Sequence, residues 1–81
     1  MAISPPEAFG QAAREIRKER GLSQEQAALN GGIDRAYYGH IERASKNATV
    51  KTIWKMGAAL STRPSDLLIR AEQILEAREN A

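Results

Sequence analysis

The chain of 81 residues is long enough for one domain, near the size at which a single core is only marginally stable. Its 42% hydrophobic and 27% charged residues exclude global disorder, and no apolar run approaches the roughly 20 residues that span a bilayer. The sequence has no cysteine, which excludes disulfides and thiolate metal sites, and residues 1–6 lack an export signal pattern. We therefore expect a cytoplasmic protein without a membrane partner.

The net charge of +2 is unevenly distributed along the chain. Residues 33–55 carry five basic and two acidic side chains, whereas residues 61–81 carry three basic and four acidic ones. Basic charge thus collects in the middle of the sequence, as the binding of phosphate groups requires.

The first helix is predicted from residue 5 to about residue 20. Ser4 and Glu7 form a capping box, Pro5 suits the first turn, and Gly21 ends the helix. Its apolar face consists of Phe9, Ala13 and Ile16.

Residues 23–44 carry the most informative pattern, two short helices joined by a tight turn. Ser23 and Gln26 form a second capping box, and Asp34 is a good N-cap for the helix that follows. Gly32 can reach the positive φ that the turn requires. The side chains that can seal the second helix onto the domain are Ile33, Tyr38 and Ile41. This pattern is typical of a helix-turn-helix, whose second helix lies in the major groove of double-stranded DNA.

Two further helices are predicted after a polar loop over residues 44–48. Thr49 can cap the first of them, which runs from residue 50 to residue 60. Its apolar stripe consists of Val50, Ile53, Met56, Gly57 and Leu60. Pro64 suits the first turn of the last helix. Its apolar face consists of Leu67, Leu68, Ala71, Ile74 and Leu75.

The outward face of the second motif helix carries candidate base-contacting residues. Arg35 is the first of these because a guanidinium can bind guanine O6 and N7 together, worth roughly 1–3 kcal/mol of discrimination. Alternatively, it pairs with Asp34. Ala36 can touch a thymine methyl group, and His40 is interpreted as a hydrogen-bonding residue in the groove. Tyr37 can reach a phosphate, a sugar or a base, or can lie flat against the first motif helix.

Flanking polar residues are expected to hold the DNA backbone. Gln24 opens the first motif helix, where its side chain and free backbone N–H groups can bind a phosphate. A second group surrounds the loop and the start of the next helix: Arg43, Ser45, Lys46, Asn47, Thr49 and Lys51. The alternative is an ordinary polar surface loop.

A longer pattern joins Gly21–Ala28, Ile33–Tyr37 and Ile41–Arg43. It resembles the Xre family of lambda-repressor-like DNA-binding domains over about residues 9–68. Asp34–Tyr37 followed by Ile41–Thr49 is further similar to the controller proteins of restriction–modification systems. The resemblance implies a five-helix domain that acts as a homodimeric transcriptional regulator on a pseudo-palindromic operator.

The resemblance also implies roles for single residues. It assigns the usual base-contacting positions to Arg35, Ala36 and His40. Lys46 matches a position that reaches bases in controller proteins. Arg17 and Glu42 match an interhelical ion pair that fixes the pose of the recognition helix, so we do not expect them to contact DNA. A contact with RNA polymerase also fits this class.

Several apolar side chains of the last two predicted helices exceed what so small a core needs: Trp54, Ile69, Ile74 and Leu75. A palindromic site needs two recognition helices about 34 Å apart, so we expect these residues to form a homodimer interface. Trp54 and Leu75 could instead complete the monomer core. Residues 49–79 would then serve both core and dimerisation, within one all-α domain of residues 1–81.

Other function classes remain as alternatives. An antitoxin-type module would bind a partner protein first and DNA second, and a phage-type repressor would share the same motif. One histidine, no glycine-rich phosphate loop and no clustered carboxylates leave no set of catalytic groups, so we expect neither an enzyme nor a cofactor or metal.

Overall fold

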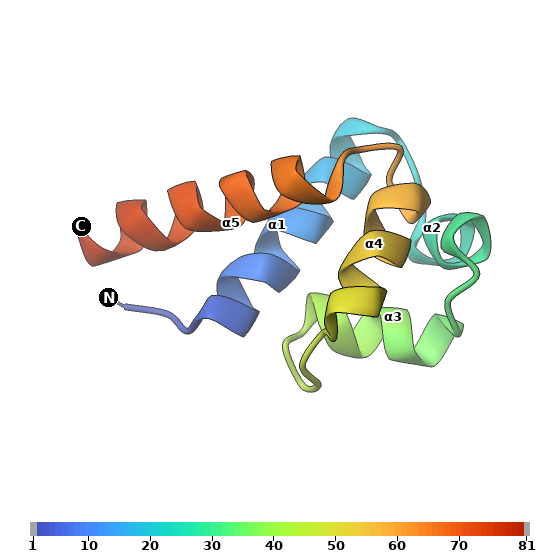
Figure 1. The fold of residues 1–81 in the computed structure, drawn as a ribbon, viewed down its shortest axis with the longest axis horizontal. Coiled ribbons are helices and arrows are strands. Elements are labelled where there is room, and N and C mark those ends of the chain that lie inside the picture. Colours follow the sequence, from blue (N-terminus) through green and yellow to red (C-terminus); the bar gives the residue numbers. More distant parts are fainter. Residues whose placement is uncertain (1, 81) are drawn as a thin grey trace.

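In the computed structural model, residues 2–80 form five helices and no strand (Figure 1). The helices are α1 (Pro5–Glu19), α2 (Gln24–Gly31), α3 (Arg35–Glu42), α4 (Val50–Ala59) and α5 (Pro64–Glu79). The predicted all-α fold is confirmed. Residues 1 and 81 of the predicted domain lie outside the described residues. Within the described part of the chain, no helix is long and apolar enough to cross a membrane.

The two longest helices, α1 and α5, lie side by side, and α2, α3 and α4 gather at one end of the pair (Figure 1). The core lies where these helices meet. Its largest fully buried side chains are Tyr38, Ile41, Met56, Leu60 and Leu67. Two of them, Tyr38 and Ile41, belong to the sealing face predicted for α3, which is therefore confirmed.

Local capping explains where four of the five helices, α1 to α4, begin. Four predicted N-caps accept a hydrogen bond from the backbone of their helix: Ser4, Ser23, Asp34 and Thr49. The turn between α2 and α3 passes through Gly32 at φ +63°, in the left-handed region that glycine adopts at little cost. These signals lie within a few residues of each helix end, which is why they could be predicted.

Two expectations for the apolar faces were wrong. Val50 is 70% exposed, and Thr52 occupies the core side of α4 instead, at 7% exposure. The hydroxyl groups of Thr52 and the cap residue Thr49 are 2.9 Å apart, so the buried oxygen has a partner and α4 can turn this face inward. On α5, Leu68 is 42% exposed although it was placed on the apolar face.

Two helix pairs approach closely at a glycine. A Cβ atom on Gly10 of α1 would lie 2.5 Å from the carbonyl oxygen of Glu42, at the end of α3. One on Gly31 of α2 would lie 2.7 Å from the carbonyl oxygen of Lys55 on α4. Neither distance is compatible with a side chain, so these glycines set how closely α1 packs on α3 and α2 on α4.

The end of α3 suggests a stabilising substitution. Ala44 has φ +59°, and the N–H groups of Ala44 and Ser45 donate to the carbonyls of Ile41 and His40, at 3.1 and 2.9 Å. This is the Schellman arrangement, in which glycine avoids a left-handed strain of roughly 1 kcal/mol that alanine suffers. We expect Ala44→Gly to raise the free energy of unfolding in urea by about 1 kcal/mol. The control, Ala58→Gly on the exposed side of α4, should lower it by about 1 kcal/mol. Equal losses in both variants would contradict the prediction.

Candidate nucleic-acid interface

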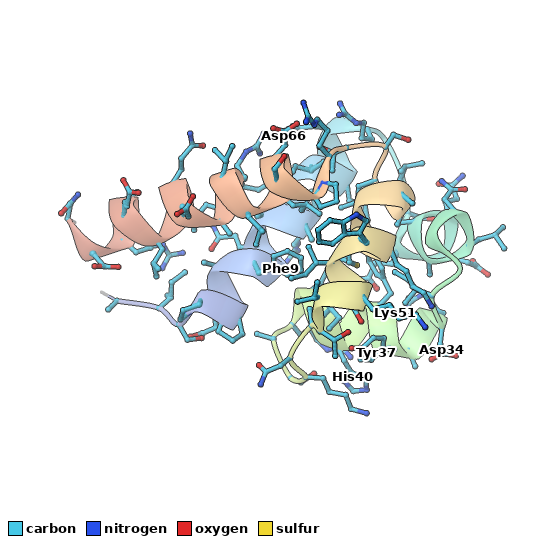
Figure 2. The ribbon with its side chains drawn as sticks, viewed as in Figure 1. Phe9, Asp34, Tyr37, His40, Lys51 and Asp66 are labelled. Carbon is cyan, nitrogen blue, oxygen red and sulfur yellow. The ribbon has the colours of Figure 1, made fainter. Side chains whose placement is uncertain are left out.

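The outward side of α3 and the start of α4 form one edge of the molecule. Asp34, Tyr37, His40 and Lys51 lie along this edge, whereas Asp66 lies at the opposite edge (Figure 2). The first turn of α3 also exposes Arg35 and Ala36. The predicted base-contacting residues of α3 therefore lie together, on a helix whose other face is sealed into the core.

Two guanidinium groups converge over the middle of α3. A Cβ atom on Gly39 would lie 2.9 Å from Nη1 of Arg43 and 3.4 Å from Nη1 of Arg35. Among residues 2–80 neither side chain has a hydrogen bond or an ion pair, so the alternative pairing of Arg35 with Asp34 is not formed. Two neighbouring cations without a counter-ion favour the binding of an anion. This convergence over Gly39 was not predicted, although arginines four residues before and after it were a signal.

Tyr37 connects α3 to the loop and to α4. Its hydroxyl donates to the carbonyl of Asn47 at 3.3 Å and lies 3.3 Å from Oγ1 of Thr52. The side chain is half-buried, and its hydroxyl lies at α4 and not against α2. The exposed part of the ring remains available to a ligand at the outer edge.

His40 and Ser45 hold each other in position. Nδ1 of His40 lies 2.7 Å from Oγ of Ser45, which also lies 3.3 Å from the carbonyl of His40. Either atom can donate in the first contact. Because Nδ1 is used in this way, Nε2 is the ring nitrogen left for an external partner.

The predicted backbone-binding residues are placed in two groups. Nε2 of Gln24 donates to Oε1 of Glu42 at 3.0 Å, which leaves its second amide hydrogen and the first N–H groups of α2 free. The other group is exposed throughout and consists of Arg43, Ser45, Lys46, Asn47, Thr49 and Lys51. Thr49 uses its hydroxyl as the cap of α4.

Arg17 joins three segments beneath this surface. Its Nε lies 2.7 Å and its Nη2 3.2 Å from the two carboxylate oxygens of Glu42, and its Nη1 donates to the carbonyl of Leu22 at 2.9 Å. The Arg17 and Glu42 side chains are only 12% and 2% exposed. Burial alone would raise the pKa of the Glu42 carboxyl, but hydrogen bonds from Arg17 and Gln24 outweigh it and hold the pKa below its usual range. The pair ties α3 to α1 as a charged unit.

The family model described as helix-turn-helix matches residues 14–67, a range that contains α2, α3 and α4. The chain belongs to the helix-turn-helix family. Control protein C.BamHI of Bacillus amyloliquefaciens is 39% identical over 61 residues, which cover 74% of this chain and 75% of that protein. Control protein C.SmaI of Serratia marcescens is 38% identical over 64 residues, which cover 79% and 76%. The crystal structure of the restriction–modification controller protein C.AhdI from Aeromonas hydrophila matches with a TM-score of 0.73 and 42% identity, covering 76% of this chain and 94% of that one.

This helix-turn-helix protein is therefore a DNA-binding regulator, and its similarity to controller proteins confirms the resemblance drawn from the sequence. Its motif consists of α2 and α3, with Gly32 in the turn. Gln24 lies on α2, and the candidate base-contacting residues Arg35, Ala36, Tyr37 and His40 lie on α3.

The expected dimer residues of the helix-turn-helix protein are divided between surface and core. Trp54 is 64% and Ile69 48% exposed, whereas Ile74 and Leu75 are half-buried against the core. The alternative in which Trp54 completes the monomer core is wrong. Two apolar crevices, of about 310 and 370 Å³, share Pro5, Phe9 and Leu68 as lining residues. These crevices and the exposed side chains of Trp54 and Ile69 are apolar surface that no element among residues 2–80 covers.

Proposed function

We propose that this protein is a restriction–modification controller, a regulator that binds a pseudo-palindromic operator as a homodimer and acts by occupying DNA rather than by catalysis. The observation that carries the proposal is the exposed face of α3, where Arg35 has no partner within the described residues, in a chain similar to controller proteins. Cytoplasmic location and a contact with RNA polymerase at activated promoters are parts of the same proposal.

Base reading would come mainly from the first two turns of α3. Arg35 would bind guanine in the major groove, and Ala36 would contact a thymine methyl group. His40 would use Nε2, because Ser45 holds Nδ1. Tyr37 would add contact through the exposed part of its ring, and Lys46 would reach a base from the loop.

Backbone binding would fix α3 in the groove from both sides. Gln24 and the free N–H groups of α2 would bind one phosphate. The exposed set after α3 would hold a second stretch of backbone: Arg43, Ser45, Asn47, Thr49 and Lys51. Such contacts add affinity and register without sequence information.

The homodimer would cover the apolar surface formed by Trp54, Ile69, Ile74 and Leu75. Two of these side chains, Trp54 of α4 and Ile69 of α5, are about half or more exposed. The crevice of about 370 Å³ that Leu75 lines lies between α1 and α5. A second copy related by a two-fold axis is the occupant that also explains a palindromic operator.

Selection of the purified protein against random duplex DNA tests the proposal, at about 150 mM salt, where non-specific binding is weak. A two-fold symmetric motif is expected. If no motif is recovered, the proposal that the protein is a sequence-specific regulator loses its main support. A protein-interaction role of the antitoxin type is then favoured.

We expect Arg35→Ala to weaken binding to the selected operator by about 10- to 100-fold for each half-site, because one bidentate guanine contact is lost. Fluorescence anisotropy with the operator duplex measures this loss. The matched control is Arg63→Ala, an exposed arginine at the start of α5 whose side chain makes no capping bond. An Arg35→Ala variant that binds as tightly as the Arg63→Ala variant would show that Arg35 does not read the operator.

A further inference from the structure

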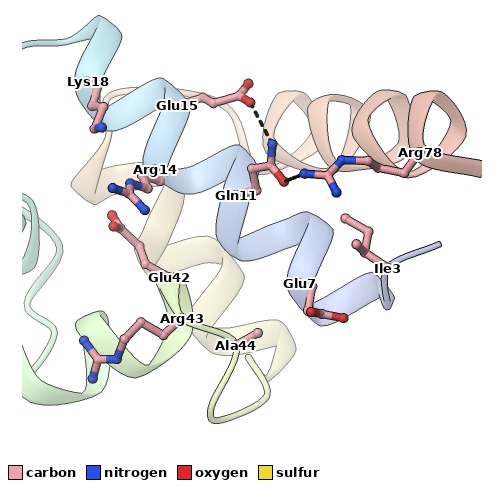
Figure 3. Close-up of a pocket in the computed structure, with 10 residues that line it drawn as sticks. All are labelled: Ile3, Glu7, Gln11, Arg14, Glu15, Lys18, Glu42, Arg43, Ala44 and Arg78. Carbon is pink, nitrogen blue, oxygen red and sulfur yellow. Dashed lines mark hydrogen bonds between the residues drawn. The ribbon is translucent and has the colours of Figure 1, made fainter. Parts of the chain in front are cut away.

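A polar groove of about 520 Å³ lies between α1 and the C-terminal end of α3 (Figure 3). Arg14 and Lys18 of α1 and Arg43, directly after α3, lie toward one end of it, and Ile3 and Arg78 toward the other (Figure 3). Arg14 and Lys18 are four residues apart on α1, so they lie on one face about one helical turn from each other.

Two of the three acidic residues of this groove are already in ion pairs within the protein, and the third is hydrogen-bonded to the backbone. Glu42 is held by Arg17 at 2.7 Å, Glu15 by Arg70 at 3.2 Å, and Glu7 accepts the backbone N–H of Ser4 at 2.9 Å. Among residues 2–80, the basic residues Arg14, Lys18 and Arg43 have no side-chain hydrogen bond or ion pair. The groove therefore presents cations whose charge is not neutralised.

The groove adjoins the face of α3 described above. Arg43 lines the groove and also places its guanidinium beside that of Arg35, over Gly39. Glu42, another lining residue, accepts a hydrogen bond from Gln24 at the start of α2. The unpaired positive charge thus continues from the recognition helix onto α1.

We propose that Arg14 and Lys18 bind phosphates of the DNA backbone next to the half-site, so that α1 is part of the DNA interface. The inference rests on the proposed function and extends it to a surface that sequence analysis left without a role. A phosphodiester backbone suits the groove, because the backbone carries a negative charge at every nucleotide. Binding it needs exposed cations and no apolar pocket. These contacts add affinity and leave the base preference unchanged.

The test is the salt dependence of binding by the full chain, with the operator duplex recovered by selection as the probe. Arg14→Gln/Lys18→Gln is expected to reduce the slope of log Kd against log salt by about 0.9 for each lost phosphate contact. It should also weaken binding more than 10-fold at about 150 mM salt while keeping the selected motif. The control is Lys55→Gln/Arg63→Gln, which removes the same charge from exposed positions outside the groove.

Equal slopes in the two double variants would overturn the inference. The same result is expected if the groove binds an acidic protein segment and not DNA, because removing Arg14 and Lys18 would then leave the slope unchanged. Circular dichroism melting of both variants establishes that they fold. A wild-type chain that selects no motif would refute the proposed function and this inference together. A wild-type chain with a clear motif and an unchanged slope in Arg14→Gln/Lys18→Gln would refute only the inference.

Discussion

Replacing Glu42 with alanine is expected to lower the free energy of unfolding by about 3–5 kcal/mol, because it leaves the guanidinium of Arg17 buried without its counter-ion. Arg17 is 12% exposed, and its remaining partner is the carbonyl of Leu22. A chain of this size has a total stability of roughly 4–12 kcal/mol, so the loss is a large share of it. Urea denaturation followed by circular dichroism measures the change.

A double variant separates the cost of an unpaired charge from the value of the pair. Arg17→Met/Glu42→Leu removes both charges and should recover most of the stability that Glu42→Ala loses. The exposed pair of Arg70 and Glu19, 2.8 Å apart, is the comparison, and Glu19→Ala should cost less than about 1 kcal/mol. If the Arg17→Met/Glu42→Leu variant is as unstable as Glu42→Ala, the charge argument is wrong.

The same carboxylate predicts a pH dependence. Because the pKa of Glu42 is lowered in the folded protein, its contribution to stability is complete above the ordinary value of 4.5. That contribution is lost as the pH falls through the lower pKa of the folded state. Glu42→Gln should therefore flatten the loss of stability in acid, measured as urea midpoints across this range.

Replacing Gly10 with alanine is expected to cost about 2–3 kcal/mol of stability, although alanine is the better helix former by about 1 kcal/mol. The added Cβ atom would lie 2.5 and 2.6 Å from the carbonyl oxygens of Glu42 and Ile41, which are backbone atoms. They cannot move aside as a side chain can, so α1 and α3 must separate. Urea denaturation measures the loss, and operator binding should weaken with it because α3 changes its pose.

Gly39→Ala is the matched control for this substitution. Its Cβ atom would meet only the ends of the Arg43 and Arg35 side chains, which can rotate away. Stability should therefore stay the same or rise by up to about 1 kcal/mol. If Gly10→Ala proves as stable as Gly39→Ala, the close approach of α1 to α3 does not hold in solution.

The residues of the candidate site could be predicted from the sequence better than the contacts among them. Arg35, Ala36 and His40 follow from the helical register of α3 relative to its sealing face. The contact of Tyr37 with Asn47 and Thr52, and the convergence of Arg35 and Arg43 over Gly39, were not predicted. They depend on where the loop and α4 lie, and on side-chain directions that residue spacing leaves open.

The sequence by itself determined the five helices and their ends, because caps such as Ser4, Ser23 and Asp34 and the turn residue Gly32 act within a few residues of themselves. It also determined the family, since the motif lies in one continuous stretch. Only the tertiary structure decided which faces are covered. The rotation of α4 leaves Val50 and Trp54 outside and turns Thr52 inward.

Tertiary packing likewise placed Gly10 of α1 against the end of α3, and Arg14 and Lys18 beside Arg43. These pairs are more than 20 residues apart in the chain. No local pattern encodes such a contact, because it forms only when the apolar faces of several helices are buried together.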